Sequence, residues 1–255
     1  MRLVNLPATR NRKRRRWAPP GFAGIRFDAA SNSGVQTAQS TYSWSHSCNG
    51  GSRFLTVDIA LLSAGQTVTS ITYNGVALTF IVAKNTITAV GRVECWGLVN
   101  PASGSNTIAV TLSGTITSAG TAVSYNNVHQ TTPTEGTNGN EATNVGAADA
   151  TVDITSVADQ CWIHAALATN DETVTAGQTS RNNVSGIGQG SGANEDFGPQ
   201  AASTKTMNYT DVGAGFTWTI AGYAIRPLSA GTPAASDDLA WLGRSRVEYE
   251  YIDIF

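Results

Sequence analysis

The sequence predicts an all-β protein: a two-sheet antiparallel β-sandwich of the jelly-roll type, with an extended N-terminal arm and a C-terminal tail. Three observations support this prediction. From Val35 onward apolar and polar residues alternate with a period of two, as in strands with one buried face. Strand-like runs are separated by turn residues at short spacing, and no run before Ser236 has a sustained helical period. Charged residues make up only 13% of the chain, where about a quarter is usual, and small polar residues replace them.

The expected strands follow one another from residue 35 to residue 227. The clearest local signal is a β-hairpin over 67–83, because Asn74-Gly75 supplies the positive φ angles that a type I′ turn needs. Segments 113–120 and 137–149 are expected turns, and the Gly- and Asn-rich stretch 181–202 is an expected loop outside the sandwich. The other expected strands are 35–47, 53–63, 90–99, 105–114, 120–128, 150–157, 160–169, 172–180, 203–210 and 215–227. So many strands without interleaved helices imply two packed sheets.

The strand pattern predicts one central domain between two different ends. We expect a basic extended arm over 1–26, the β-sandwich over 27–228, and a linker with a docking tail over 229–255. Cys95-Trp96 and Cys161-Trp162 each open an apolar strand, so a duplicated pair of half-sandwiches is the alternative to a single domain.

The arm carries a concentrated positive charge. Residues 1–16 hold seven Lys or Arg and no acid, whereas the rest of the chain holds nine basic and eighteen acidic residues. Such an arm binds either an acidic protein surface, as an extended strap that Pro19 and Pro20 keep open, or nucleic acid through its phosphates. A solvated charged tail is the third alternative. The candidate partner-binding residues are Arg10, Arg12, Lys13, Arg14, Arg15, Arg16 and Trp17.

The tail combines a short helix signal with an alternating end. Ser236 is a suitable N-cap, acids follow it, and an apolar cluster comes next. The last nine residues alternate aromatic and charged positions, as a strand added to a neighbour's sheet would. A tail that packs back on its own sandwich has the same pattern, so both alternatives stand. The candidate partner-binding residues are Trp241, Leu242, Tyr249, Tyr251, Ile252 and Phe255.

The sequence contains no catalytic constellation. Its three histidines, His46, His129 and His164, lack the spacing of a metal site, and no G-x-S-x-G motif is present. The glycines of 186–192 are not followed by a helix, as a phosphate-binding loop requires. We therefore expect no enzyme, no metal and no cofactor. The widely spaced cysteines are expected as buried thiols, with a disulfide plus one spare, or a metal site, as alternatives; they are Cys48, Cys95 and Cys161.

Neither a secretory signal nor a membrane span is evident. The basic run is followed by prolines rather than by an apolar run, and no later stretch reaches the roughly eighteen apolar residues of a span. The sequence therefore predicts a soluble protein without a membrane partner.

Strand tryptophans leave carbohydrate binding open. Aromatic rings on one sheet face would form a sugar-stacking platform, although burial in the core is the commoner place for a strand tryptophan. The four candidates are Trp44, Trp96, Trp162 and Trp218.

Four motifs carry a resemblance: Tyr73–Val76, Leu98–Pro101, Gly104–Thr111 and Trp218–Pro227. Together they resemble uncharacterised β-sandwich proteins of tailed phages and prophages, over roughly residues 28–228. The resemblance implies a virion component made in the host cytoplasm: a capsid decoration or cement protein, a head fibre or a tail appendage. It also implies other virion proteins as partners and a homo-oligomer, with a trimer as the leading expectation. Neither the arm nor the tail belongs to the pattern. The alternatives are a carbohydrate-binding module and a capsid protein with a genome-binding arm.

Overall fold

The computed structural model describes residues 24–63, 65–86, 91–143, 149–171, 174–186, 191–210 and 215–228. Every regular element assigned in the described residues is a β-strand, so the predicted all-β class is confirmed. The strands are β1 (Arg26–Cys48), β2 (Phe54–Leu61), β3 (Val68–Tyr73), β4 (Val76–Ala77), β5 (Thr79–Asn85), β6 (Arg92–Val99), β7 (Gly104–Asn126), β8 (Thr134–Ala142), β9 (Ala150–Thr155), β10 (Cys161–Thr169), β11 (Thr175–Ala176), β12 (Thr179–Ser185), β13 (Ser191–Gln200), β14 (Thr204–Thr210) and β15 (Trp218–Ile225).

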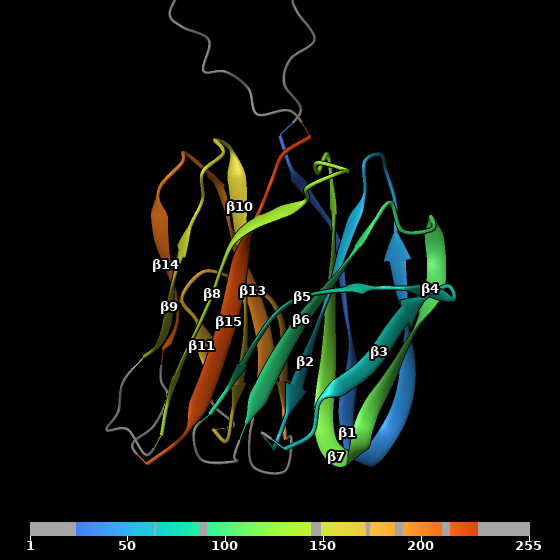
Figure 1. Cartoon of the computed structure of the whole chain (residues 1–255), viewed down its shortest axis with the longest axis vertical. Coiled ribbons are helices and arrows are strands. Elements are labelled where there is room, and N and C mark those ends of the chain that lie inside the picture. Colours follow the sequence, from blue (N-terminus) through green and yellow to red (C-terminus); the bar gives the residue numbers. More distant parts are fainter. Residues whose placement is uncertain are drawn as a thin grey trace, which may run out of the picture.

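The strands form three antiparallel sheets. The first sheet has the order β4-β3-β7-β2-β6-β5, with β1 paired to β7; the second is β12-β13-β10-β15-β8; the third is β11-β14-β9. The second sheet lies between the other two (Figure 1). The predicted two-sheet jelly roll is therefore not confirmed, because alternation along a strand fixes which face is buried but not which sheet covers it.

The first sheet curls until it is nearly closed, and the long strand β7 is responsible. Its first half pairs with β3 and its second half with β2, while β1 pairs with it along almost its whole length. The predicted turn over 113–120 is wrong, because these residues continue β7. Their small side chains have a packing role: a Cβ on Gly120 would lie 2.5 Å from the ring of Trp44.

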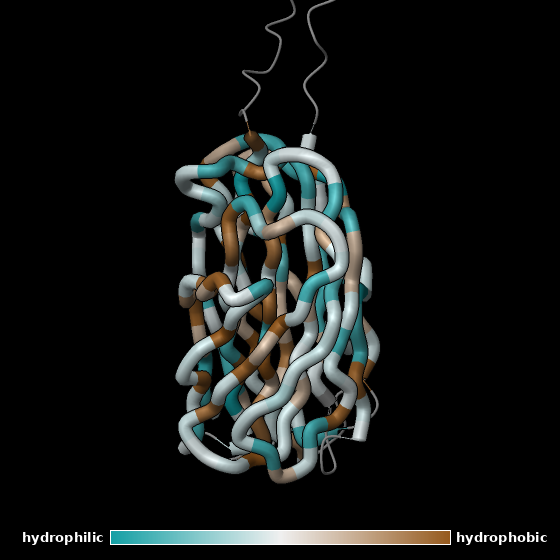
Figure 2. Tube along the Cα trace, turned by 90° about the vertical axis from the view of Figure 1, so that its right-hand side faces the viewer, coloured by the Kyte–Doolittle hydropathy of each residue, from teal (hydrophilic) through white to brown (hydrophobic). Residues whose placement is uncertain are grey.

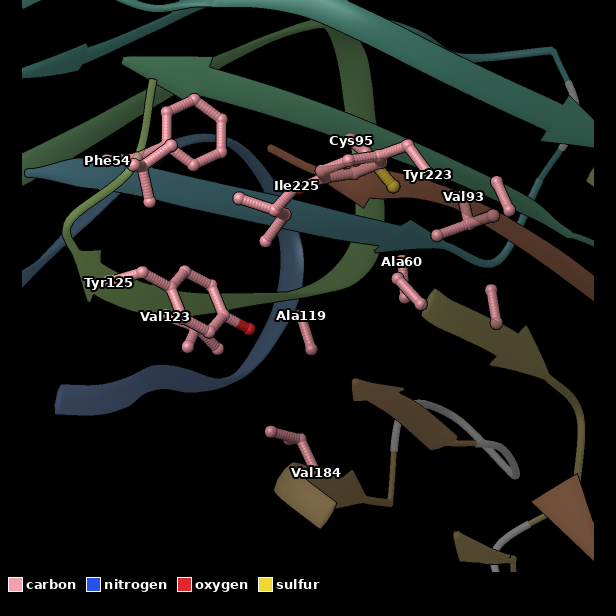
Figure 3. Packing of buried hydrophobic residues seen from close by; sticks show 14 of the residues in the cluster. Phe54, Ala60, Val93, Cys95, Ala119, Val123, Tyr125, Val184, Tyr223 and Ile225 are labelled. Atoms are coloured by element: carbon pink, nitrogen blue, oxygen red, sulfur yellow. The ribbon is translucent and has the colours of Figure 1, made fainter. Parts of the chain in front are cut away.

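Three hydrophobic cores fill the spaces between the layers. The first core lies between the first and second sheets, and Figure 3 shows Phe54, Tyr125 and Ile225 packed within it. The second core lies between the second and third sheets, and the third core lies inside the curled first sheet. Strands β2 and β15 are buried along their whole length, and β10 at every residue except the partly buried Trp162, because each strand serves two cores. Figure 2 shows hydrophobic and hydrophilic residues alternating along much of the chain.

The predicted hairpin is confirmed at its turn, although it is shorter than expected. Asn74 and Gly75 have φ angles of 50° and 78°, and Tyr73 pairs with Val76. The second arm then ends at Ala77, and β5 crosses to pair with β6 at the other edge of the first sheet. The remainder of the expected hairpin over 67–83 is therefore divided between the two edges.

Two segments expected as turns or loops are strands of the second sheet. Residues 137–142 of the expected turn belong to the edge strand β8, and residues 181–185 and 191–200 of the expected loop belong to β12 and β13, which pair antiparallel. These interpretations were wrong because the segments are rich in Asn, Asp, Glu and Gly, a composition typical of loops. In β13 the side chains of Asn194 and Asp196 are buried and find partners on other strands, so the strand tolerates them.

Candidate functional site

The two ends of the described chain lie side by side and share one residue. The side-chain amide of Asn127 donates to the carbonyl of Gly24 at 3.0 Å, and the main-chain carbonyl of Asn127 accepts from the amide of Leu228 at 2.7 Å. Asn127 has a φ of 61°, so the chain turns there directly after β7. Both ends therefore lie at the same end of the molecule (Figure 1), and residues 1–23 and 229–255 are joined to the sandwich at neighbouring points.

A surface pocket of about 440 Å³ lies close to this junction, between β5 and β6 of the first sheet and β8 of the second. The segment that leads into β8 forms one wall, and the main-chain amide of Arg226 donates to the carbonyl of Pro133 in that wall at 2.8 Å. The lining residues are Phe54, Thr79, Phe80, Ile81, Gly97, Leu98, Val99, Thr131, Pro133, Thr134 and Thr137.

The pocket lining is apolar and hydroxylic, and it contains no charged side chain. Phe80 is 49% exposed, and its ring meets the ring of Trp96 edge-on with the centroids 5.5 Å apart. The backbone comes close at Gly97, where a Cβ would lie 2.7 Å from Phe54. The pocket therefore suits an uncharged, largely apolar group.

A buried polar network joins the first and second sheets. The imidazole Nε2 of His164 lies 2.8 Å from the Asp58 carboxylate, which also accepts from the Asn194 amide at 2.8 Å. On the other side of the ring, Nδ1 lies 3.2 Å from the Tyr125 hydroxyl, which donates to Asp196 at 2.8 Å. The network therefore runs continuously through the first core.

An arginine adds a charged partner to this network. The Nε of Arg181 lies 2.7 Å from the Asp196 carboxylate. The buried carboxylates of Asp58 and Asp196 therefore both have hydrogen-bond partners, as burial of a polar group requires.

This arrangement has the parts of a proton relay but no access for a substrate. His164 is fully buried and Asp58 is 2% exposed. The gap between the sheets beside Asp58 is lined mainly by small side chains, among them Ala60, Ala119 and Ala166. The network joins two sheets that share no hydrogen-bonded strand pair in the described chain, and we interpret it as structural.

The other histidines also have structural surroundings. His46 is buried, with Nδ1 2.8 Å from the Ser31 hydroxyl, and burial lowers its pKa to about 4. His129 lies in a surface loop, where Nδ1 accepts from the amide of Thr132 at 3.0 Å. Within the described residues no three His, Cys, Asp or Glu side chains are grouped to hold a metal ion.

The cysteines and tryptophans are spread over the three cores. The predicted buried thiols are confirmed, because Cys48, Cys95 and Cys161 are all buried and free. Burial raises the pKa of the Cys161 thiol to about 12. The tryptophans do not share one sheet face: Trp162 packs against the first core, Trp218 is buried in the second, and the other two pack against the third.

All thirteen residues predicted to bind partners lie outside the described residues. They are Arg10, Arg12, Lys13, Arg14, Arg15, Arg16 and Trp17 of the arm, and Trp241, Leu242, Tyr249, Tyr251, Ile252 and Phe255 of the tail. Sequence reasoning missed the pocket and the network, whose members are far apart in the chain. One signal was available: Asn194, Glu195 and Asp196 interrupt an otherwise uncharged stretch.

Comparison of the chain with protein-family models, with curated proteins and with solved structures gives no match. In the described part of the chain, no helix has the length and apolar character to cross a membrane. The geometry of the fold and the chemistry of its two ends are therefore the evidence that bears on function.

Proposed function

We propose that this chain is a non-enzymatic structural protein of a bacteriophage virion, a capsid decoration protein or a head or tail appendage held by its terminal segments. The observation that carries the proposal is the shared bonding of Gly24 and Leu228 to Asn127. A block whose two terminal segments leave from one point can be attached to a surface at that end, with the rest projecting outward.

Two attached segments hold more firmly than one. Once the first segment is bound, the second binds as an intramolecular event at an effective concentration that reaches the millimolar range for short linkers. Since the attachment points are adjacent, both segments reach the same partner surface without strain on the sandwich. The three stacked cores make the sandwich a rigid block, which can be attached at one end while its other end is exposed to solvent.

The basic arm is the first anchor. Its charges meet carboxylates on a neighbouring virion protein, and Pro19 and Pro20 keep the backbone extended, which reduces the entropy lost on binding. The end of the tail, residues 247–255, is the second anchor and adds a strand to a partner sheet. Repetition of the tail contact among copies gives a homo-oligomer, for which a trimer is our proposal.

Replacing the six basic residues of 10–16 by glutamine is expected to abolish attachment to purified particles, because the neutral arm no longer pairs with carboxylates. Binding is measured by co-sedimentation with particles lacking the protein, and mass spectrometry of native particles should find many copies each. The matched control has lysine at all six positions and should attach nearly as well as the native chain.

Two results would contradict the proposal. Absence of the protein from purified particles, with recovery only from the lysate, would exclude a virion role. Attachment restricted to DNA-filled shells, together with binding of free DNA that weakens steeply with salt, would favour the genome-binding arm instead.

A further inference from the structure

We propose that the pocket between β5, β6 and β8 binds the segment Leu239–Leu242 of the same chain, with Trp241 as the inserted side chain. This goes beyond the proposed function, which requires only that the end of the tail reaches a partner. It assigns the first half of the tail to the sandwich itself and leaves residues 247–255 for the partner.

The position of the pocket is the first argument. The chain leaves the described structure at Leu228, whose amide is bonded to Asn127. The pocket wall formed by Thr131 and Pro133 begins only four positions after Asn127, and Pro133 accepts from the amide of Arg226. Val128 and Pro227 also form an isolated antiparallel bridge between the two segments. The tail therefore starts beside the wall of the pocket.

The length of the tail is the second argument. Trp241 stands thirteen positions after Leu228, and an extended chain of that length spans roughly 43–47 Å. This is far more than the tail needs to turn back to a neighbouring wall. A tethered segment with slack of this order is present at high effective concentration, so a modest intrinsic affinity suffices for occupancy.

The chemistry of the lining selects this part of the tail. Phe54, Ile81 and Leu98 supply apolar contact, and the half-exposed ring of Phe80 offers an edge for an indole. The threonine hydroxyls of the wall are acceptors for the indole N–H. No side-chain hydrogen bond found within the described residues uses the hydroxyls of the lining threonines, which are Thr79, Thr131, Thr134 and Thr137.

The end of the tail fits the same pocket less well. Residues 247–255 carry Glu248, Glu250 and Asp253 between their apolar side chains, and the lining has no cation to pair with them. Burying an unpaired carboxylate is costly. Segment 239–242 is entirely uncharged, and the acids Asp237 and Asp238 precede it rather than lie within it.

A cysteine pair in the full-length chain tests the proposal. Thr137→Cys on the pocket wall is combined with Ala240→Cys beside Trp241, and disulfide formation is followed by mass spectrometry under mild oxidation. The matched control combines Ala240→Cys with Val157→Cys. Val157 is 79% exposed and its amide bonds to Glu135 of β8, so it lies outside the pocket but near the same strand. The native cysteines are buried in both variants.

We expect the pocket pair to close an intramolecular disulfide at least about tenfold faster than the control pair, at a rate that does not change on dilution. Adding Trp241→Ser should reduce the rate to that of the control. Equal rates for the two pairs would overturn the proposal. A faster reaction that gives mainly disulfide-linked dimers would also overturn it, because the pocket would then hold the tail of another copy.

Hydrogen exchange provides a second test that leaves the pocket unaltered. In the Trp241→Ala chain, amides of β5 and of residues 131–137 should exchange faster than in the native chain, while those of β12 stay unchanged. Unchanged exchange in both regions would contradict occupancy by Trp241. These results do not depend on virion attachment, so the proposed function and this inference fail separately.

Discussion

Replacing Asp58 by alanine is expected to lower the free energy of unfolding by about 2–6 kcal/mol, because two buried polar groups lose a partner at a cost of about 1–3 kcal/mol each. The carboxylate, 2% exposed, lies 2.8 Å from Nε2 of His164 and accepts from the Asn194 amide at 2.8 Å. Without it, the buried His164 ring and the Asn194 amide each lose a hydrogen-bond partner. Denaturant unfolding at neutral pH, followed by circular dichroism, measures the loss.

The matched control for Asp58 is Asp153→Ala. Asp153 is also on a strand and accepts from the hydroxyl of Thr206 at 2.6 Å, but its side chain is exposed. This substitution should cost about 1 kcal/mol or less. The double variant Asp58→Leu with His164→Phe removes both partners together, and it should lose less than the sum of the two single losses. Equal losses for Asp58→Ala and Asp153→Ala would show that the network adds nothing to stability.

Glu195→Gln is expected to change the pH dependence of stability, because the Glu195 carboxyl is buried with only part of its hydrogen bonding satisfied. One oxygen accepts from the amide of Gln178 at 2.9 Å, and the other makes no hydrogen bond of ordinary geometry in the described structure, although the Asn208 backbone also favours the charged form. Burial raises its pKa from 4.5 to about 7. Between these values the folded chain keeps a proton that the unfolded chain releases, so this group costs stability as pH rises from 4.5 to 7, by about 3 kcal/mol in total.

His46 changes the pH dependence of stability in the opposite direction to Glu195. Burial lowers its pKa from 6.5 to about 4, so between these values the unfolded chain binds a proton that the folded chain does not. Its contribution is therefore fully present above 6.5 and is lost as pH falls to 4, again by about 3 kcal/mol. Over pH 4.5–6.5 the two contributions nearly cancel.

The single variants should separate these two contributions. Relative to the native chain, Glu195→Gln should gain about 3 kcal/mol between pH 4.5 and 7, and His46→Gln should gain a similar amount between pH 6.5 and 4. Guanidinium unfolding at pH 4, 4.5, 5.5, 6.5 and 7.5 measures both differences. Curves that run parallel to that of the native chain would contradict the assigned pKa values.

The sequence predicted those parts of the fold whose signal is local. Strands β10 and β15 lie within expected strands because each is mostly apolar, and the Asn74-Gly75 turn depends on two adjacent residues. The pattern failed where polar residues are buried. Asn194 is acceptable in β13 because distant residues bond to its side chain, among them Asp58, 136 positions earlier, and Thr121. The pattern of a few neighbouring residues does not indicate contacts with residues so far away in the sequence.

The candidate site divides in the same way. Charge and aromatic pattern alone identified the arm and the tail as attachment segments, and both remain predictions. The shared Asn127 contact and the pocket depend on which distant strands become neighbours: Phe54, Phe80 and Pro133 meet only after the first and second sheets have packed. The third sheet was not predicted for the same reason. Its strands alternate like those of the other sheets, and nothing in their sequence indicates that they pair with one another in a separate sheet.

The pairing of β1 with β7 has a consequence for how the chain is made. Cys48 pairs with Gly104 and Arg26 with Asn126, so the partner of β1, the first strand of the described residues, is synthesised 56 to 100 residues after the residues that it pairs with. At about 5–20 residues per second the last of these pairs waits on the order of 5–20 s. A long unpaired strand is a site of aggregation during that interval. Strand β1 is rich in Ser, Thr, Gln and Asn and has few large apolar residues, a composition that keeps the nascent chain soluble until β7 is synthesised.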